Sequence, residues 1–350
     1  MSDLLWIEID LKKIKENILN IQKYAKKKLI PIIKSNAYNL GDLELMKLVK
    51  ELDLDYAAVV DLNEALALLK HDANYKILIL NSIEKHEYAY LNEFKNLAIS
   101  INRVEDIQNL EKQKITRNLK VHIQIDTGMN RHGFNNIQNF EDGIEKLKLL
   151  ANVEIEGLYT HFSSLKKSFV QLNIFKGYVE KYPFKIIHLA ASSTYKQLDF
   201  GNYVRVGLDM YGSTKENQAI KVACYPLSIN DVLKGQTIGY DETYKAKKDM
   251  KVAVLPIGYA NGFRRDLKGS MVMVYNKLYK TIGNVCMNHL FVQVDDDVNL
   301  NSEFIITSPD HPIEEMAKHL HTIPHEILCM LNIKTKKYIR WNKWPIENFI

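Results

Sequence analysis

The sequence predicts an α/β protein in which a (β/α)8 barrel of the TIM type is followed by a mostly β C-terminal domain. Eight short apolar runs alternate with amphipathic helical patterns over the first two-thirds of the 350 residues, and this pattern is typical of parallel strands joined by helices. The turn after the first run reads SNAYNLGD and lacks the GxGxxG pattern of a doubly wound open sheet. Beyond residue 228 the sequence changes to short strand patterns separated by Gly and Asn turns.

The expected barrel strands are rich in Ile, Val and Leu, as strands buried on both faces of a parallel sheet should be. They are residues 30–34, 55–60, 76–80, 97–101, 120–126, 154–161, 185–191 and 204–209. The helical patterns between them include residues 42–52, 62–72, 103–113 and 166–182. Eight strand–helix units within about 200 residues are typical of a closed barrel.

Two domains are expected for a chain of this length. We place the barrel at residues 11–228, where a helix over 11–27 comes first, and the C-terminal β domain at residues 229–350. One helical stretch near 311–320 interrupts that domain. The strand-like run at 4–10 has no partner among the eight barrel strands, so we expect it to pair with a later strand, in the C-terminal domain.

Composition and charge exclude several classes of protein. Hydrophobic residues make up 46% and charged residues 25% of the sequence, which is ordinary for a globular protein. The net charge of +5 is spread along the chain without a cluster of basic and aromatic residues, so nucleic-acid binding is not predicted. No secretory signal and no apolar run of about 18 residues is found, which predicts a cytoplasmic protein without a membrane span. The three distant cysteines predict reduced thiols rather than disulfides or a metal site.

Candidate catalytic residues lie where the expected strands end, and active sites of barrels gather at the carboxyl ends of the strands. Lys34 ends the first run, the segment 126–131 (DTGMNR) follows the fifth, His161 ends the sixth and Arg205 lies in the eighth. An amine at the end of an Ile-rich strand would be partly shielded from water. Burial disfavours its charged form, which makes it the nucleophile that a Schiff base with an aldehyde requires. His188, in the seventh run, is interpreted as a core histidine.

Six motifs resemble those of the alanine racemase family, in the family's order and close to its spacing. They are residues 32–38 (IIKSNAY), 127–133 (TGMNRHG), 160–163 (THFS), 204–212 (VRVGLDMYG), 258–262 (GYANG) and 283–288 (GNVCMN). The resemblance extends from residue 4 to about residue 345. One motif alone would be weak, because a lysine after a strand or a tyrosine in a β-rich stretch is more often structural. Six motifs in order favour the functional interpretation.

The resemblance implies a homodimer that binds pyridoxal 5'-phosphate (PLP) in the barrel. Lys34 would hold PLP as an imine and act as the base on one face of the substrate, with Tyr259 of the partner subunit as the base on the other face. Racemisation needs two such bases, one to take the α-proton and one to return it. A phenol is a weak base at neutral pH, so His161 would assist Tyr259 by a hydrogen bond. Arg205 would donate to the pyridine nitrogen, and the resulting weak electron sink suits racemisation better than transamination.

The remaining roles implied by the resemblance concern binding. The cofactor-binding set consists of Lys34, Tyr38, His161, Ser192, Arg205, Gly207 and Leu208, of which Tyr38, Ser192 and the backbone of Gly207 and Leu208 would hold the phosphate. Arg131 and the backbone of Met287 would hold the carboxylate of the substrate.

Four positions depart from the family's pattern. Gln124 stands where the family usually has a carbamylated lysine that positions the substrate-binding arginine. That arginine would therefore be oriented otherwise, by the amide oxygen of Gln124 or by a bound anion. Asn288 replaces an aspartate, Ala191 replaces an asparagine, and the tyrosine of the entrance gate is matched by Ile333 or by Tyr338. These departures bear on the preferred substrate and on rate more than on the type of reaction.

The predicted function is PLP-dependent alanine racemisation that supplies D-alanine for peptidoglycan. A serine racemase or a broad-specificity racemase on the same scaffold is the close alternative. A PLP decarboxylase of this barrel type would have an acidic residue at the pyridine nitrogen, where Arg205 is expected here. A PLP carrier with a single barrel would lack the second domain that bears Tyr259.

Overall fold

The structure is a computed structural model, and it describes residues 4–340 of the chain. Contacts between residues divide the chain into two compact units. The barrel unit comprises residues 18–37 and 41–207, and the C-terminal unit comprises, among the described residues, 4–17, 38–40 and 208–340. Each unit has its own set of fully buried apolar side chains, such as Ile99 in the first and Leu255 in the second.

Eight parallel strands within residues 4–340 form the barrel, which confirms the predicted fold class. They are β2 (Lys28–Pro31), β3 (Ala57–Val59), β4 (Ile77–Ile79), β5 (Leu97–Ile101), β6 (Leu119–Ile125), β7 (Val153–Thr160), β8 (Ile186–Ala190) and β9 (Tyr203–Val206). Their spatial order is β2-β9-β8-β7-β6-β5-β4-β3. A bridge between Ile32 and Ala58 joins the two ends of this sheet, and the backbone N–H of Ile33 donates to the carbonyl of Ala58 at 3.0 Å.

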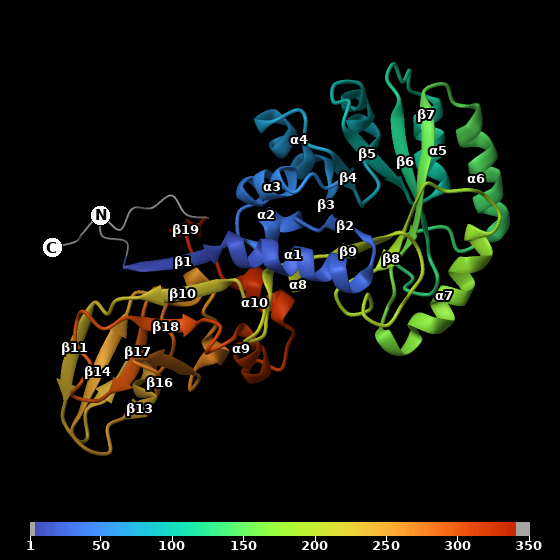
Figure 1. Ribbon diagram of the computed structural model, residues 1–350. Helices are drawn as coiled ribbons and strands as arrows, with labels where there is room; N and C mark the ends of the chain where they lie inside the picture. The colour runs from blue at the N-terminus through green and yellow to red at the C-terminus, as the bar shows by residue number, and fades with distance from the viewer. Residues whose placement is uncertain (1–3, 341–350) are drawn as a thin grey trace. The chain divides into compact units, whose positions relative to one another are not determined.

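Helices connect the barrel strands, as the alternating pattern predicts. α1 (Leu11–Ala25) precedes the first barrel strand. The helices between barrel strands are α2 (Lys34–Tyr38), α3 (Asp42–Glu51), α4 (Leu62–His71), the 3-10 helix η1 (Lys85–Asn92), α5 (Val104–Glu111), α6 (Ile137–Leu149) and α7 (Leu165–Val179). In Figure 1, α6 and α7 lie outside β6 and β7. Asp61, Asn136 and Ser164 each accept a backbone N–H at the start of α4, α6 and α7, and such a cap contributes about 1 kcal/mol to a helix.

The interior of the barrel contains polar side chains as well as apolar ones. Ser100, His122, Gln124, Glu156, His188 and Arg205 are all at least nine-tenths buried. Buried polar groups are costly unless they are hydrogen-bonded, and these six bond to one another or to neighbouring groups. These buried polar groups make the barrel interior the candidate location of a reaction in this unit.

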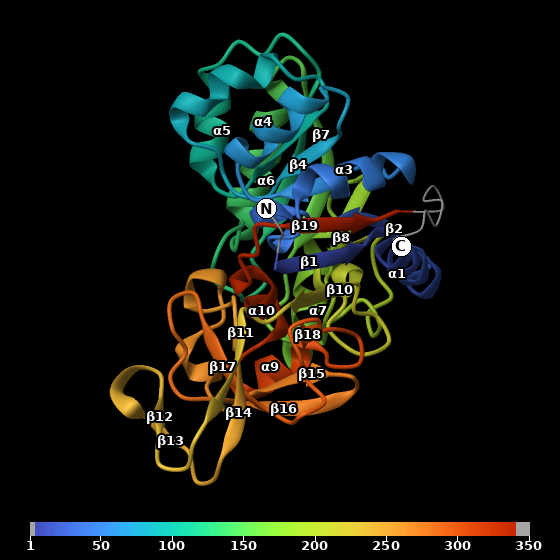
Figure 2. The same ribbon diagram turned by 90° about the vertical axis from the view of Figure 1, so that its left-hand side faces the viewer.

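The C-terminal unit is built on a nine-stranded sheet among its described residues, in the order β11-β14-β17-β16-β15-β18-β10-β1-β19. The strands are β1 (Leu5–Asp10), β10 (Ile220–Cys224), β11 (Ser228–Val232), β14 (Met250–Leu255), β15 (Met271–Val274), β16 (Lys277–Ile282), β17 (Leu290–Val294), β18 (Phe304–Thr307) and β19 (Lys336–Ile339). Figure 2 shows β1 between β10 and β19. The expectation that the run at 4–10 pairs with later strands is confirmed.

Short elements complete this unit. They are α8 (Leu208–Tyr211), β12 (Thr237–Ile238), η2 (Tyr240–Glu242), β13 (Tyr244–Lys245), η3 (Tyr259–Asn261), η4 (Arg265–Leu267), α9 (Ile313–His319) and α10 (Pro324–Met330). The β12–β13 hairpin packs through Ile238 against Val252 and Ile282 of the large sheet. None of the helices within residues 4–340 is long and apolar enough to cross a membrane.

The expected boundaries differ from the structure at two points that matter for function. The last barrel strand ends at Val206 and α8 begins at Leu208, so the run expected over 204–209 contains both a strand and the start of a helix. β10 precedes residue 228 but pairs with β1 and β18. The domain boundary at 228, expected from the change in sequence pattern, remains a prediction.

Candidate active site

Lys34 follows the end of the first barrel strand and opens a turn of left-handed backbone. Residues 35–39 all have φ between 50° and 70°, and a left-handed conformation costs about 1–2 kcal/mol for each residue that is not glycine. Glu64 supports this turn, because its carboxylate accepts the N–H of Ser35 at 2.6 Å and that of Val60 at 2.8 Å. Strained backbone of this kind is concentrated at functional sites. Lys34 is half-buried, and no hydrogen bond or ion pair of its amine is found within the described part of the chain.

Arg131 lies on a loop that Asp126 fixes. One carboxylate oxygen of Asp126 accepts the backbone N–H groups of Gly128, Met129 and Asn130 at 2.8–3.0 Å. The loop returns to β6 at Gly133, where φ is +115° and an added Cβ would lie 2.6 Å from the backbone nitrogen of Asp126. The exposed Arg131 side chain is thus carried by a loop with little freedom, beyond the carboxyl end of β6.

Arg205 is a buried cation whose described contacts use only its two terminal nitrogens. Nη1 donates to His188 at Nδ1 (2.7 Å) and at its carbonyl (2.8 Å). Nη2 donates to the carbonyl of Thr160 (2.7 Å) and to Nδ1 of His161 (3.4 Å). Burial lowers the pKa of Arg205 to about 10, so the group stays charged at neutral pH. Its Nε–H takes no part in these four contacts and is suited to a neutral acceptor such as a ring nitrogen.

His161 is held in its neutral form. Burial lowers its pKa to about 3, and the charges of Arg205, Arg131 and Lys34 act in the same direction. A guanidinium can only donate, so Nδ1 of His161 accepts from Arg205 and its proton lies on Nε2. These electrostatic effects also indicate that Lys34, Arg131, His161 and Arg205 lie near one another in the barrel unit.

Tyr159 connects Arg205 to Gln124, and the sequence interpretation overlooked it. Its ring stacks on His188 with 4.6 Å between centroids, and the Arg205 guanidinium carbon lies 4.8 Å from the ring centroid. Its hydroxyl lies 2.9 Å from the amide oxygen of Gln124 and 2.8 Å from Ser100 Oγ. Burial raises the pKa of Tyr159 to about 12, so the phenol keeps its proton. Gln124 is therefore fixed by Tyr159, and no hydrogen bond from Arg131 to Gln124 is found within residues 4–340.

His122, His188 and Glu156 are further buried polar residues behind Arg205. The sequence interpretation treated His188 as a core histidine, and the structure shows it fully buried with a hydrogen bond to Arg205. His122 and Glu156 were not singled out. The alternation of side chains along a strand could have found His122, since it lies two residues before Gln124 in β6 and shares its face.

Gly157 leaves the space that the His122 ring occupies. A Cβ at this position would lie 2.4 Å from Nδ1 of His122. We expect Gly157→Ala to lower the free energy of unfolding by about 3 kcal/mol, because overpacking of a core has this order of cost. Chemical denaturation followed by circular dichroism measures the change. Gly177→Ala on α7 is the matched control, since a Cβ there meets nothing within 4 Å, and equal losses in the two variants would contradict the explanation.

Tyr259 and Met287 lie on adjacent segments of the C-terminal unit. The N–H of Tyr259 donates to the carbonyl of Cys286 at 3.1 Å, and the N–H of Ala260 donates to that of Met287 at 2.9 Å. Gly258 permits this approach, because its Cβ would lie 2.3 Å from the carbonyl oxygen of Cys286. Tyr259 is 43% exposed and Met287 is 55% exposed, so both side chains are accessible on this unit.

Other predicted binding residues are distributed over the two units. Ser192 and Gly207 lie beyond the ends of β8 and β9 in the barrel unit, and Leu208 begins α8 in the C-terminal unit. Tyr38 is buried beside Tyr211, with 5.1 Å between ring centroids, and burial followed by the nearby Cys329 raises its pKa to about 12. The Tyr38 hydroxyl thus keeps its proton at neutral pH, and it could donate a hydrogen bond to an anionic phosphate.

The two candidates for the entrance gate have different environments in the C-terminal unit. Ile333 is 2% exposed. Tyr338 lies in β19, and its hydroxyl donates to the carbonyl of Leu40 at 2.8 Å. Which of the two occupies the gate stays a prediction.

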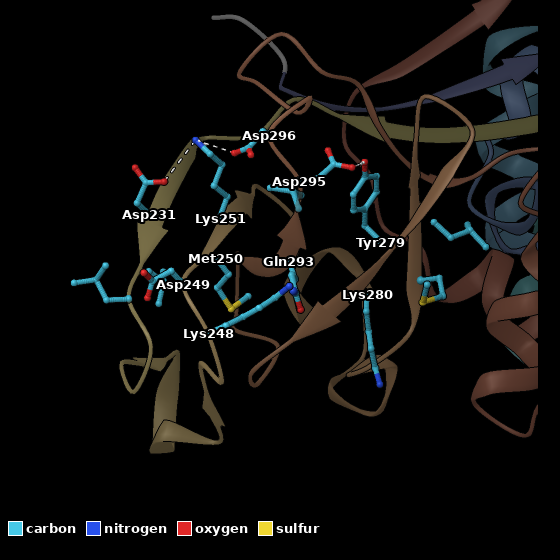
Figure 3. A pocket seen from close by; sticks show the side chains of 15 residues that line it. Asp231, Lys248, Asp249, Met250, Lys251, Tyr279, Lys280, Gln293, Asp295 and Asp296 are labelled. Atoms are coloured by element: carbon cyan, nitrogen blue, oxygen red, sulfur yellow. Dashed lines mark hydrogen bonds and ion pairs between the residues drawn. The ribbon is translucent and has the colours of Figure 1, made fainter.

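A groove of about 750 Å³ on the C-terminal sheet carries none of the predicted residues. Figure 3 shows its charged lining, in which Lys251 pairs with Asp231 at 3.5 Å and Asp296 at 3.8 Å. Tyr279 donates to Asp295 at 2.8 Å. Because the groove carries none of the expected bases or cofactor-binding residues, we assign the chemistry to the polar barrel interior instead.

The residues of the barrel unit fit PLP by the chemistry of their groups. A half-buried amine without a carboxylate partner is what an aldehyde needs, and Lys34 provides one. A permanently charged donor with a free N–H suits an unprotonated pyridine nitrogen, and Arg205 provides that. Arg131 adds positive charge, which favours a coenzyme and a substrate that are both anionic.

Comparisons with known proteins agree with this geometry. The family model described as the alanine racemase N-terminal domain matches residues 9–215, and that of the alanine racemase C-terminal domain matches residues 219–339. The alanine racemase of Methanococcus maripaludis is 29% identical over 96% of this chain and 99% of its own length. That of Clostridium kluyveri is 31% identical over 99% and 97%, respectively.

Solved structures agree with the same assignment. The alanine racemase of Clostridium difficile superposes with a TM-score of 0.89 at 27% identity, over 98% of this chain and 97% of its own. The alanine racemase of E. faecalis superposes with a TM-score of 0.88 at 25% identity, over 96% and 98%. Both matches extend through the barrel and the C-terminal sheet. This chain therefore belongs to the alanine racemase family.

Proposed function

We propose that this chain interconverts L-alanine and D-alanine with PLP as its coenzyme. The observation that carries the proposal is the buried Arg205 guanidinium beside a neutral His161, with the Lys34 amine within electrostatic range of that histidine. The name alanine racemase on relatives that match nearly the whole chain supports the substrate. A Bacillus anthracis alanine racemase solved with bound L-Ala-P supports a site for an alanine-like ligand.

The proposed mechanism uses two bases on opposite faces of the substrate. When bound to Lys34, PLP supplies an electron sink that makes the α-proton of an attached amino acid easier to remove. Lys34 Nζ takes or returns that proton on one face, and Tyr259 Oη of the partner subunit does so on the other. The Nε2–H of His161 donates to the phenolate of Tyr259 and stabilises the basic form. Arg205 would donate its Nε–H to the pyridine nitrogen, which would then stay unprotonated.

The remaining residues bind and orient. Arg131 holds the carboxylate of the substrate together with the backbone N–H of Met287. Tyr38, Ser192 and the backbone of Gly207 and Leu208 would hold the phosphate. We also propose that the enzyme is a cytoplasmic homodimer, with domains at 11–228 and 229–350, that supplies D-alanine for peptidoglycan.

Purified protein loaded with PLP is expected to be yellow, and borohydride should fix the coenzyme to Lys34 by reducing the carbon–nitrogen bond. Peptide mapping by mass spectrometry locates the label. Lys34→Ala should lose it, whereas Lys28→Ala, which removes an amine that pairs with Asp55 at 2.9 Å, should keep it. A protein that takes up no PLP would contradict the cofactor assignment.

The substrate is tested by assaying D-amino acid production from a panel of L-amino acids. Alanine is expected to give the highest kcat/KM. A higher value for serine would instead favour the serine or broad-specificity racemase, and would direct attention to Gln124 and Asn288.

A further inference from the structure

A continuous chain of buried side chains runs from Arg205 to a carboxylate in the barrel interior. Arg205 Nη1 lies 2.7 Å from Nδ1 of His188, and Nε2 of His188 lies 2.8 Å from Nδ1 of His122. Nε2 of His122 lies 3.2 Å from a carboxylate oxygen of Glu156. All four side chains are at most 4% exposed, so water does not interrupt the chain.

The chemistry of its two ends fixes the direction of every proton in this chain. A guanidinium only donates and a carboxylate only accepts. Nδ1 of His188 must therefore accept from Arg205, which leaves the proton of His188 on Nε2. That proton points at Nδ1 of His122, so the proton of His122 is on Nε2 as well and points at Glu156. Both imidazoles are neutral, since burial lowers the pKa of His122 and of His188.

Glu156 is the negatively charged end of this series of hydrogen-bonded side chains. The Tyr56 hydroxyl donates to it at 2.6 Å and Lys120 at 2.6 Å. Burial acts to raise the pKa of Glu156, but the hydrogen bonds from His122, Lys120 and Tyr56 outweigh this effect and hold it well below its usual range. The carboxylate is thus ionised at neutral pH.

Arg205 depends on the negative charge of Glu156, because none of the described contacts of Arg205 is with a carboxylate. Within residues 4–340 its described partners are two carbonyl oxygens, two neutral imidazoles and the ring of Tyr159. A buried cation is costly without compensating charge. Hydrogen bonds in a chain polarise one another, so the Glu156 charge makes Nδ1 of His188 a stronger acceptor for Arg205.

We propose that Glu156 is a positioning residue for the reaction, which acts through His122 and His188 to hold Arg205 in one orientation. With Nη1 committed to His188, the Nε–H of Arg205 is left for the pyridine nitrogen, and this last step rests on the proposed function. Without the charge of Glu156, only the contact with Arg205 still holds the two imidazoles in their tautomers, and the opposite arrangement becomes less costly. A proton on Nδ1 of His188 would then face Arg205 and displace it.

The first test is nitrogen NMR of the full chain with ¹⁵N-labelled histidine, both loaded with PLP and free of it. Substitution of single histidines assigns the signals. Both His122 and His188 are expected to show the Nε2–H tautomer in either state. A proton on Nδ1 of either ring, or a doubly protonated ring near neutral pH, would overturn the proposal without any variant, and this result does not depend on whether the protein binds PLP or racemises alanine.

The second test compares Glu156→Gln with Glu154→Gln, which removes a charge from the same strand at a side chain that bonds to Asn118 at 2.8 Å. In the PLP-loaded protein, Glu156→Gln should lower kcat about tenfold and leave KM within about twofold. This is the size of effect expected when a residue that orients another site residue is removed. The rate of transamination relative to racemisation should rise. Mixed tautomers of His188 should appear in the same sample.

The control variant should leave the kinetics and the tautomers unchanged. Unchanged kinetics in a folded Glu156→Gln protein would overturn the proposal, as would a loss that Glu154→Gln shares. A merely structural role for Glu156 would lower stability without altering the ratio of transamination to racemisation. If the wild-type protein binds PLP but does not racemise alanine, the proposed function fails while the tautomer result still decides this inference.

Discussion

Replacing Tyr259 with Phe is expected to stop α-hydrogen exchange in one enantiomer of alanine and to preserve it in the other. If Tyr259 of the partner subunit and Lys34 serve opposite faces, the variant loses one base and retains the other. Loss of a positioned general base typically costs 10²–10⁴-fold, so we expect racemisation to fall by about 10³-fold. Exchange from the Lys34 face should remain within about tenfold of its original rate.

The measurement must be isotope exchange, because racemisation has an equilibrium constant of one and kcat/KM must therefore fall equally in both directions. Incorporation of deuterium at the α-carbon, followed by NMR from each pure enantiomer, separates the two faces. Tyr275→Phe, an exposed tyrosine in the turn between β15 and β16, is the matched control and should change neither rate. Equal loss of exchange from both enantiomers would refute the two-face assignment.

The folded protein is expected to lose stability steeply below about pH 6, because three histidines of the barrel unit, the buried His122 and His188 and the half-buried His161, resist protonation. Burial, with the charges of Arg205, Arg131 and Lys34, lowers the pKa of His161 to about 3. Burial also lowers the pKa of His122 and of His188. Above an unfolded pKa of about 6.5 neither state binds these protons, so the stability is fully present. Below it the unfolded chain binds protons that the folded chain does not.

A histidine whose folded pKa lies far below its unfolded pKa contributes about 1.4 kcal/mol per pH unit once its unfolded form is protonated. His161 and His188 together therefore give a slope of about 3 kcal/mol per unit, and His122 adds to it in the same direction. Domains are typically stable by about 5–15 kcal/mol, so we expect unfolding near pH 4–5 if the stability lies at the lower end of this range, and at lower pH otherwise. Glu156 adds to the slope only below about pH 4.5, since it is the unfolded carboxyl that then takes up protons.

Urea denaturation at a series of pH values measures this slope. His86→Gln, which removes an exposed histidine of η1, should leave it unchanged, whereas His161→Gln should reduce it by about one proton. A slope no steeper than one proton in the wild-type protein would show that the barrel histidines titrate freely.

The barrel could be predicted because its signal is local. The runs rich in Ile, Val and Leu at 76–80 and 97–101 correspond closely to β4 and β5, since strands covered by helices on one side and a filled barrel on the other need continuous apolar sequence. Lys34 was expected to end a strand, but it opens a left-handed turn. Propensities do not predict such a turn in SNAYN, because its cost is offset by contacts such as that of Glu64 with the backbone of Ser35.

The sequence alone determined the family, the order of the motifs and the identity of the groups that could carry the reaction, because these properties belong to residue types and their spacing. Only the tertiary structure decided which of those groups are charged and where their protons lie. His188 illustrates the difference: the sequence shows a histidine in an apolar strand, and its protonation follows from Arg205 on one side and His122 on the other. Hydrogen bonds and burial between strands distant in the chain set these properties, and neither is encoded at a single position.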